Sequence, residues 1–366
     1  MKRLLCILSN MNAGGAETFL MKVYRTIDRT KYQFDFCLNT KERCFYEPEI
    51  EKLGGKIYRI PAKSENLQLF KNQLGKIIAE NQYQYVLRIT ANAAGLLDLK
   101  IAKQAGADVC IARSSNSNSE KGIKNVVVHI LGKLLYLKYV DVGFAPSKLA
   151  AEYTFGKKSV ETNKVSIIHN ALDINVYEFN PSRRESIRKG FGLSEGDLLI
   201  GNIGRFMSQK NHNFIIEIFD KIHALKPNAY LVLVGNGELE NIIRDQVKNK
   251  GLERNVIFTG VRSDIPDILS AMDVMLMPSL YEGMPNTVIE AQATGLPCVI
   301  SDSITSEANI TGLVKYVSLS KSSDFWADEV LKAISNTRLN TKKMFVDSGY
   351  DIESVTRQFV HIVFGD

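Results

Sequence analysis

Short apolar, β-rich runs recur along the chain, and each is bounded by turn residues. They are RLLCILS, FDFCLN, KIYRI, YVLRIT, DVCIA, VDVGFAP, VSIIHN, LLIGNIG, YLVLVGNG, VIFTG, VMLMPS and LPCVISD. Between them, apolar residues recur at helical spacing in segments such as 16–27, 213–225 and 238–249. Strands that alternate with helices predict parallel sheets with helices on both faces, so the expected fold class is α/β.

The pattern restarts after Asn180-Pro181, which indicates a second sheet. Residues 169–197 contain no strand-like run, and the charge balance changes sign there. A chain of 366 residues is long enough for two domains of ordinary size. We therefore predict two Rossmann-like, doubly wound domains, residues 1–170 and 171–348, facing an interdomain cleft. Because open α/β sheets bind ligands at the carboxyl ends of strands, the informative residues should lie in the loops that follow strands.

The composition excludes several classes of protein. Charged residues make up 23% of the chain and hydrophobic residues 45%, as in soluble globular proteins. The five cysteines are scattered without a CxxC pair, which indicates reduced thiols in the cytosol. The apolar run after Met1 is too short for a signal peptide, and no run reaches the roughly 18 residues that span a bilayer. We expect a cytoplasmic protein.

The net charge of +6 is unevenly distributed. Residues 1–170 carry 26 Lys and Arg against 15 Asp and Glu, a net charge of +11, whereas residues 171–366 carry 20 against 25. A basic half suits nucleic acid, anionic lipid or a phosphorylated substrate. Nucleic acid is the weakest of the three, because no zinc finger, RRM or homeodomain pattern accompanies the charge.

Two glycine-containing loops are candidates for binding phosphate. Gly14 and Gly15 open the first helix, where backbone N–H groups could approach a phosphate, but without other evidence a tight turn is the better interpretation. Arg205 and Lys210 follow the first strand of the second half. They are either solvated surface cations or a clamp for a diphosphate that would replace Mg²⁺ as the counter-charge. No DxD-like carboxylate pair stands out, so we expect no metal.

The stretch SLYEGMPNTVIEAQATG has the features of a site. Pro285 predicts the first turn of a helix that runs to about Thr294 before Gly295 ends it. Glu282 then lies in the preceding loop and Glu290 on the helix, at most about 12 Å apart. This arrangement fits a nucleotide sugar, with the helix N-terminus under the diphosphate. Each glutamate taken alone could equally be an exposed side chain.

With these motifs the chain resembles the GT4 family of retaining glycosyltransferases, which have the GT-B fold, and is similar to bacterial capsule and exopolysaccharide transferases. Glu282 and Glu290 match the family's Glu-x7-Glu motif within YEGMPNTVIEAQATGLPCVISD. GNIGRFMSQKN matches its phosphate loop, LVLVGNGELE the following strand and turn, and VIFTGVRSDIPDILSAMDVMLMPS its base-binding region. GGAE and HNALD match as well, the latter with Ala171 where Gly is usual. The likeness covers nearly the whole chain and is strongest in the second half.

The resemblance implies a role for each matching residue. As catalytic residues, Glu282 would bind the hydroxyls of the donor sugar, and Arg205 and Lys210 the diphosphate, while Glu290 would bind the ribose. The anomeric configuration would be retained by same-face attack, with the acceptor's proton passed to a leaving phosphate oxygen. A last helix within 349–366 would cross back onto the first domain. The other implied donor-binding residues are Gly14, Gly15, Gly204, Val261 (through its backbone, to the base), Gly283, Met284, Pro285, Asn286 and Thr287.

The chain departs from the family in its first domain. Relatives often carry histidine at the strand ends that correspond to Arg88 and Arg113, and arginine cannot act as a general base near neutral pH. Either arginine would instead bind an anionic group of the donor or acceptor, or the site is degenerate. None of the histidines clearly substitutes; they are His129, His169, His212, His223 and His361.

Residues 121–140 mix an apolar face with Lys121, Lys124, Lys133 and Lys138. On general grounds this segment is a helix that faces the core and carries solvated lysines. It could instead contact anionic lipid at the inner face of the cell membrane, where a lipid-linked acceptor would enter. The positive charge of the first half favours the second interpretation.

The main hypothesis is a metal-independent retaining glycosyltransferase. It would move a hexosyl or N-acetylhexosaminyl group from a nucleotide-diphosphate sugar, expected to be a UDP-sugar, to a glycan or lipid-linked glycan in surface polysaccharide assembly. One alternative is a non-catalytic GT-B protein that binds nucleotide or glycan for a partner transferase, and a weaker one is a sugar-nucleotide epimerase. A nicotinamide dehydrogenase is disfavoured because no GxGxxG motif stands at a strand-to-helix turn. The sugar, acceptor and linkage depend on a few polar contacts that the sequence does not position.

Overall fold

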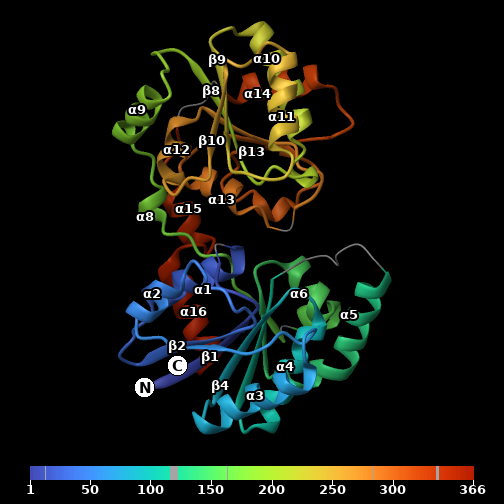
Figure 1. The fold of residues 1–366 in the computed structure, drawn as a ribbon. Helices are drawn as coiled ribbons and strands as arrows, with labels where there is room; N and C mark the ends of the chain where they lie inside the picture. The colour runs from blue at the N-terminus through green and yellow to red at the C-terminus, as the bar shows by residue number, and fades with distance from the viewer. Residues whose placement is uncertain (13, 116–122, 163, 283, 335–337) are drawn as a thin grey trace. The chain divides into compact units, whose positions relative to one another are not determined.

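Two separate parallel sheets organise the chain (Figure 1). The computed structural model describes the whole chain apart from residues 13, 116–122, 163, 283 and 335–337. Its contacts divide the chain into unit 1, which comprises residues 1–171 and 349–366, and unit 2, which comprises residues 172–348. Each unit has one sheet and its own hydrophobic core.

The sheet of unit 1 has 7 parallel strands in the order β3-β2-β1-β4-β5-β6-β7. The strands are β1 (Lys2–Leu8), β2 (Tyr32–Leu38), β3 (Ile57–Arg59), β4 (Tyr85–Thr90), β5 (Val109–Ser114), β6 (Val142–Ala145) and β7 (Val165–Ile167). The helices are α1 (Gly15–Thr26), α2 (Glu47–Lys52), α3 (Leu67–Glu80), η1 (Ala93–Leu96), α4 (Leu97–Gln104), α5 (Ile123–Tyr136), η2 (Leu137–Tyr139), α6 (Lys148–Phe155), α7 (Lys157–Glu161) and α16 (Ile352–Phe364). The strand order changes direction between β1 and β4, which is where open α/β sheets bind ligands.

Both faces of this sheet are buried. Leu87 of β4 packs on one face with Phe19 of α1 and Phe359 of α16. Its neighbour Val86 packs on the other face with Phe70 of α3. Because successive side chains of a strand point to opposite faces, a strand covered on both sides has the continuous apolar run that the sequence contains.

The sheet of unit 2 has 6 parallel strands in the order β10-β9-β8-β11-β12-β13. The strands are β8 (Leu198–Ile203), β9 (Ala229–Val234), β10 (Val256–Gly260), β11 (Val274–Met277), β12 (Cys298–Ser301) and β13 (Val314–Val317). The helices are α8 (Ile174–Tyr177), α9 (Pro181–Gly190), η3 (Ser208–Lys210), α10 (His212–Leu225), α11 (Glu240–Asn249), α12 (Ile265–Ala271), α13 (Asn286–Ala293), η4 (Ser306–Ala308), α14 (Ser323–Ile334) and α15 (Lys342–Asp347). Buried side chains of α10 and α14 cover one face, and those of α12 and α13 cover the other.

The predicted α/β class and its two parallel-sheet domains are confirmed, and each predicted strand is present. The structure adds β13, which the sequence pattern did not reveal. This strand lies at the edge of the sheet, and only its end residues Val314 and Val317 are buried, while Lys315 is exposed. Four residues with two buried positions carry too little periodicity to be recognised as a strand.

All five cysteines are buried as free thiols.

Candidate functional site

Two loops of unit 2 are joined by an ion pair. Glu282 lies in the loop between β11 and α13, and Lys210 ends the short helix η3 between β8 and α10. The Nζ atom of Lys210 lies 2.7 Å from Oε1 of Glu282. Their side chains are only 17% and 9% exposed, respectively. The structure therefore brings into contact two residues to which the resemblance gives separate roles, at the diphosphate and at the sugar.

Gln209 holds the same two loops together, and the sequence analysis did not single it out. Its Nε2 donates a hydrogen bond to the carbonyl of Tyr281 at 2.9 Å and lies 3.4 Å from Oε2 of Glu282. Its own carbonyl accepts from the backbone N–H of Leu280 at 2.8 Å. Both oxygens of Glu282 thus face a donor, Lys210 on one side and Gln209 on the other. The only signal in the sequence was the position of Gln209 beside Lys210.

The stem of Lys210 packs over Gly204. A Cβ at Gly204 would lie 3.2 Å from both Cδ and Cε of Lys210. Gly235, which follows β9, has a φ of +136°, and a Cβ there would lie 2.2 Å from the carbonyl oxygen of Gly204. The loops after β8 and β9 therefore touch backbone to backbone. This contact explains the glycine at position 235 without any ligand.

Arg205, the second predicted phosphate-binding cation, differs from Lys210 in its surroundings. Its side chain is exposed, and it forms no hydrogen bond or ion pair with any residue that the structure describes. Lys210 is therefore paired with a carboxylate, whereas Arg205 is available to bind an anion.

The helix that follows Glu282 has the predicted bounds. Pro285 precedes α13, which spans Asn286–Ala293, and Gly295 ends it with a φ of +66°. The N–H groups of a helix's first turn have no acceptor within the helix, so this end favours an anion. Of the predicted contacts here, Met284, Asn286 and Thr287 are half-buried. Gly283 lies outside the described residues.

Glu290 is held by a residue that the sequence analysis missed. The hydroxyl of Tyr177, the last residue of α8, donates a hydrogen bond to the Glu290 carboxylate. Burial, together with the negative charge of Glu290, raises the pKa of Tyr177 well above its usual value. Nothing in the sequence links these positions, because 112 residues separate them and α8 is a single turn.

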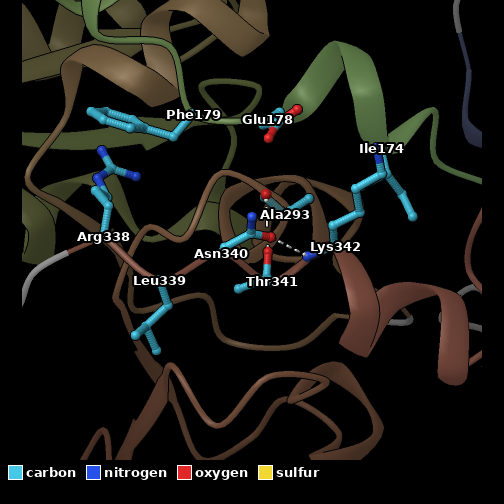
Figure 2. Close-up of a pocket in the computed structure, with 9 residues that line it drawn as sticks. All are labelled: Ile174, Glu178, Phe179, Ala293, Arg338, Leu339, Asn340, Thr341 and Lys342. Carbon is cyan, nitrogen blue, oxygen red and sulfur yellow. Dashed lines mark hydrogen bonds between the residues drawn. The ribbon is translucent and has the colours of Figure 1, made fainter.

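A pocket of about 180 Å³ lies at the C-terminal end of α13, beside Ala293 (Figure 2). Arg338 lines it, and burial lowers the pKa of this arginine to about 10. Its Nη1 donates to the carbonyl of Thr294 at 3.1 Å, and Thr341 Oγ1 donates to the carbonyls of Gln292 and Ala293 at 2.9 and 3.0 Å. These bonds satisfy carbonyls that have no partner within the helix. The polar groups of this pocket therefore hold α13 in place from the end opposite Glu282.

Val261 directly follows β10 and is 72% exposed. The residue is therefore accessible at the carboxyl end of that strand. In the part of the chain that the structure describes, no group of three or more His, Cys, Asp or Glu side chains could hold a metal ion.

The two most buried histidines are neutral structural residues. His212 begins α10, stacks on Phe206 at 4.4 Å between ring centroids, and has its pKa lowered to about 4 by burial and by Lys210. His129 on α5 accepts from the backbone N–H of Ala93 at Nδ1 (3.1 Å), so its Nε2 must donate to the carbonyl of Tyr153 (3.0 Å). Burial lowers the pKa of His129 as well.

Gly14 and Gly15 begin α1 in unit 1, as predicted, and a carboxylate lies over them. A Cβ at Gly14 would be only 2.3 Å from Oε2 of Glu17. Burial raises the pKa of this glutamate. A residue with a Cβ at position 14 would therefore require the side chain of Glu17 to move.

Arg88 and Arg113 do not form one site, because they lie on opposite faces of the sheet. Arg88 pairs in register with Ala112 of β5, so it shares the face of Ala112, and its Nε lies 3.2 Å from Oδ2 of Asp98 on α4. Arg113 lies on the face of α1, fully buried, with its guanidinium 4.2 Å from the ring of Phe19. Its Nη2 donates to Oδ1 of Asn170 at 2.7 Å, and burial lowers its pKa to about 10.

Helix α5 presents an apolar face to solvent. Large apolar side chains that are 39% to 74% exposed gather on it; they are Val126, Val127, Val128, Ile130, Leu131, Leu134 and Leu135. Gly132 packs on η1 so closely that a Cβ would lie 2.5 Å from the carbonyl carbon of Ala93. Lys133 is not solvated as expected, because its Nζ donates to the carbonyl of Tyr153 at 2.8 Å. Lys121 and the side chain of Lys124 lie outside the described residues.

None of the described helices is long and apolar enough to cross a bilayer.

Comparison with known proteins gives consistent results. Residues 183–351 match the family described as Glycosyl transferases group 1. The chain is 32% identical over 360 residues to the putative glycosyltransferase EpsF of Bacillus subtilis, covering 96% of this chain and 94% of that protein. It is 28% identical over 288 residues to the UDP-Gal:alpha-D-GlcNAc-diphosphoundecaprenol alpha-1,3-galactosyltransferase of Escherichia coli, covering 74% and 72%. The crystal structure of Anabaena HepE in complex with UDP and glucose superimposes with a TM-score of 0.78 at 18% identity, covering 99% of both chains.

Proposed function

The chain belongs to the group 1 glycosyl transferases, a GT4-like family with the GT-B fold, and we propose that it transfers a sugar from a UDP-sugar to a glycan or lipid-linked glycan in polysaccharide assembly. The proposal includes a hexosyl or N-acetylhexosaminyl group, retention of its anomeric configuration, and independence of metal ions. The observation that carries it is the contact of Lys210 with Glu282 beside the N-terminus of α13, which also carries Glu290. The UDP in HepE and the UDP-Gal named for the Escherichia coli relative support the choice of donor.

In this proposal Lys210 and Arg205 hold the diphosphate, with the N-terminus of α13 beneath it. Charge-assisted hydrogen bonds from two cations contribute about 1.5–3 kcal/mol each, and the helix dipole adds to them. Together they supply the counter-charge that Mg²⁺ provides in metal-dependent transfer. Lys210 is proposed to turn from Glu282 to the phosphate, which would free one carboxylate oxygen for the sugar.

Glu282 then accepts from hydroxyls of the sugar, and Glu290 accepts from the ribose. The hydrogen bond from Tyr177 is proposed to fix the orientation of the Glu290 carboxylate, which suits a group that must accept from the ribose hydroxyls. Val261, an exposed residue, is proposed to contact the base through its backbone. Gly204 leaves space for the stem of Lys210, and Met284 and Pro285 are proposed to line the phosphate.

The proposed reaction breaks the bond between the anomeric carbon and the phosphate oxygen and forms a bond to the acceptor oxygen on the same face. The acceptor's proton passes to the leaving phosphate oxygen, so no histidine is needed as a base. The main catalytic task is therefore to stabilise the negative charge that develops on the diphosphate. Residues 171–348 are proposed as the donor domain and residues 1–170, with the last helix, as the acceptor side. Gly14, Gly15 and Arg113 are proposed contacts to an anionic group of the donor or acceptor.

We also propose that the exposed face of α5 rests on an anionic membrane. Apolar side chains on one face of a helix gain free energy when they enter the headgroup boundary, and basic residues strengthen attraction to anionic lipid. Residues 121–164 carry 8 Lys against 3 Asp and Glu, so the charge of unit 1 is concentrated around this helix. The undecaprenol-linked acceptor named for the Escherichia coli relative supports this placement.

A thermal-shift screen against UDP, GDP, ADP and dTDP, and the common sugars of each, tests the donor site. A ligand at 100 times its dissociation constant adds about 2.7 kcal/mol of stability, which moves the melting midpoint by a few degrees. We expect UDP to shift the wild type, Glu290→Ala to abolish the shift, and Glu282→Ala to lose only the increment due to the sugar. If no nucleotide shifts the midpoint, the proposed activity is wrong.

A further inference from the structure

Asn211 has a backbone conformation that few residues other than glycine adopt. It stands between η3 and α10 with a φ of +56° and a ψ of +44°, in the left-handed region. Among the residues that the structure describes, Gln82 is the only other non-glycine residue with a positive φ. A Cβ crowds the backbone in this conformation, so a fold keeps such a residue where its surroundings require the turn.

The left-handed turn sets the direction of Lys210, the residue before it. The helix α10 begins directly after Asn211, whose carbonyl accepts from the N–H groups of Phe214 and Ile215 at 3.1 and 3.2 Å. The short helix η3 ends at Lys210. The chain therefore changes direction between two helices at a single residue, and this change places the stem of Lys210 over Gly204.

The side-chain amide of Asn211 fixes the turn to the neighbouring strand. Its Nδ2 donates to the carbonyl of Pro278, directly after β11, at 3.1 Å. The ladder of backbone hydrogen bonds between β8 and β11 ends earlier, at the pair Gly201 and Met275. The amide thus joins the two chain segments at a point where the sheet no longer does.

Contacts of this kind recur at every second residue of the segment after Met275. They join Asn202 to Leu276, Asn211 to Pro278, Gln209 to Leu280 and Lys210 to Glu282. The first three use backbone atoms of the β11 segment, so they do not depend on the charge of either partner. The last joins two charged side chains, and a bound anion competes with it for the ammonium group. Asn211 provides the backbone-anchored contact on the residue next to Lys210.

From the left-handed turn and its amide contact, we infer that Asn211 is a positioning residue for the diphosphate of the donor. It holds Lys210 where the ammonium group can exchange Glu282 for a phosphate oxygen, without touching the donor itself. Asparagine suits this position because it tolerates the left-handed region and also carries the amide donor that glycine lacks. The inference rests on the proposed function, since it takes Lys210 as a ligand of the diphosphate.

Calorimetric titration of the full chain with UDP tests this role. Asn211→Gly keeps the left-handed turn but removes the amide, and it should weaken UDP binding by about fivefold, as expected for one hydrogen bond. Asn211→Ala removes the amide and also disfavours the turn, so it should weaken binding by about 25-fold or more. Gln82→Gly is the matched control, because it changes the other left-handed residue and should leave UDP binding unchanged.

A second background separates positioning from a general loosening of the loop. In Lys210→Met there is no ammonium group to position, so adding Asn211→Gly should cause no further loss of UDP affinity. A loosened loop would instead weaken the contacts of Arg205 and α13 as well, and the two losses would add.

Two results would overturn the inference and leave the proposed function standing. One is an Asn211→Gly variant that binds UDP as tightly as the wild type. The other is the same loss of affinity from Asn211→Gly with and without Lys210. A wild-type protein that does not bind UDP is a different result, because it defeats the proposed function and the inference with it.

Discussion

Lys210 Nζ and Glu282 Oε1 lie 2.7 Å apart, and both side chains are largely shielded from water. Removal of one partner of a shielded pair costs more than the pair contributes, because the other charge stays behind without compensation. The pair therefore has two consequences that can be separated, one for stability without ligand and one for donor binding.

Lys210→Met should reduce the free energy of unfolding by about 3 kcal/mol, since it leaves the carboxylate of Glu282 unpaired. Adding Glu282→Gln to Lys210→Met should recover most of the lost stability, because the double variant has no shielded charge without a partner. Urea unfolding of the wild type and both variants measures this. Lys250→Met, which breaks a more exposed pair with Asp220 at the same 2.7 Å, should cost less than about 1 kcal/mol. A double variant no more stable than Lys210→Met would contradict the explanation.

Gln209→Ala should weaken binding of the UDP-sugar by about fivefold while leaving the affinity for UDP unchanged. Once Lys210 turns to the diphosphate, the amide of Gln209 is what holds Glu282 toward the sugar, and one such hydrogen bond is worth about 1 kcal/mol. Calorimetric titration with both ligands separates the two effects. Gln246→Ala is the matched control, because that amide donates to the carbonyl of Asn213 at 3.1 Å away from the site. Equal losses for UDP and UDP-sugar would indicate a general disturbance of the loop.

Tyr177→Phe should reduce the preference for UDP over 2′-deoxy-UDP. The change removes only the hydroxyl that orients Glu290, so it affects the contact with the ribose hydroxyls and little else. The expected loss is about fivefold in UDP affinity, with 2′-deoxy-UDP affected less. Tyr316→Phe serves as the control, since that hydroxyl donates to the carbonyl of Thr305 at 3.0 Å. An unchanged ratio would show that Glu290 does not depend on Tyr177.

Acidification should destabilise the protein through His212. Its pKa is near 6.5 when unfolded and about 4 when folded, so between these values the unfolded state binds more protons. The associated stability is complete above pH 6.5 and is lost as the pH falls toward 4, by up to about 3 kcal/mol. His212→Phe, which keeps the stack on Phe206, should flatten this part of the pH profile in urea unfolding. His361→Phe, at an exposed position, should leave it unchanged. If the stability of wild type and of His212→Phe depends on pH in the same way, the prediction is wrong.

Leu131→Glu combined with Leu134→Glu should lower binding to anionic vesicles by about tenfold or more, because both side chains would have to enter the headgroup boundary. Co-sedimentation with phosphatidylglycerol-containing vesicles, against pure phosphatidylcholine, gives the measurement. Leu225→Glu with Ile242→Glu is the control, since these exposed residues of unit 2 lie on other helices. If the wild-type protein does not bind anionic vesicles, the membrane contact is disproved. If the wild type is a dimer and the α5 variant is not, the exposed face of α5 binds a second copy of the chain instead.

The local pattern of the sequence predicted the elements that carry the candidate site. The run VMLMPS, followed by Glu282, Pro285 and Gly295, determined a strand, a loop and a helix with nearly the bounds that the structure has. These features depend on residues a few positions apart, such as a proline that opens a helix and a glycine that ends it. For the same reason β13, with four residues and two buried positions, carried too little local signal.

What the tertiary structure alone decided was which of these residues meet. Arg88 and Arg113 both stand near strand ends in the sequence, but the register of β4 and β5 places them on opposite faces of the sheet. Gln209 and Tyr177 contact the two glutamates although 72 and 112 residues, respectively, lie between them in the sequence. The sequence by itself determined the strands, the helices and the residue types at the loop ends, because short-range sterics and periodicity govern them. The partners, burial and charge state of those residues depend on contacts between distant segments, which form only when the chain packs.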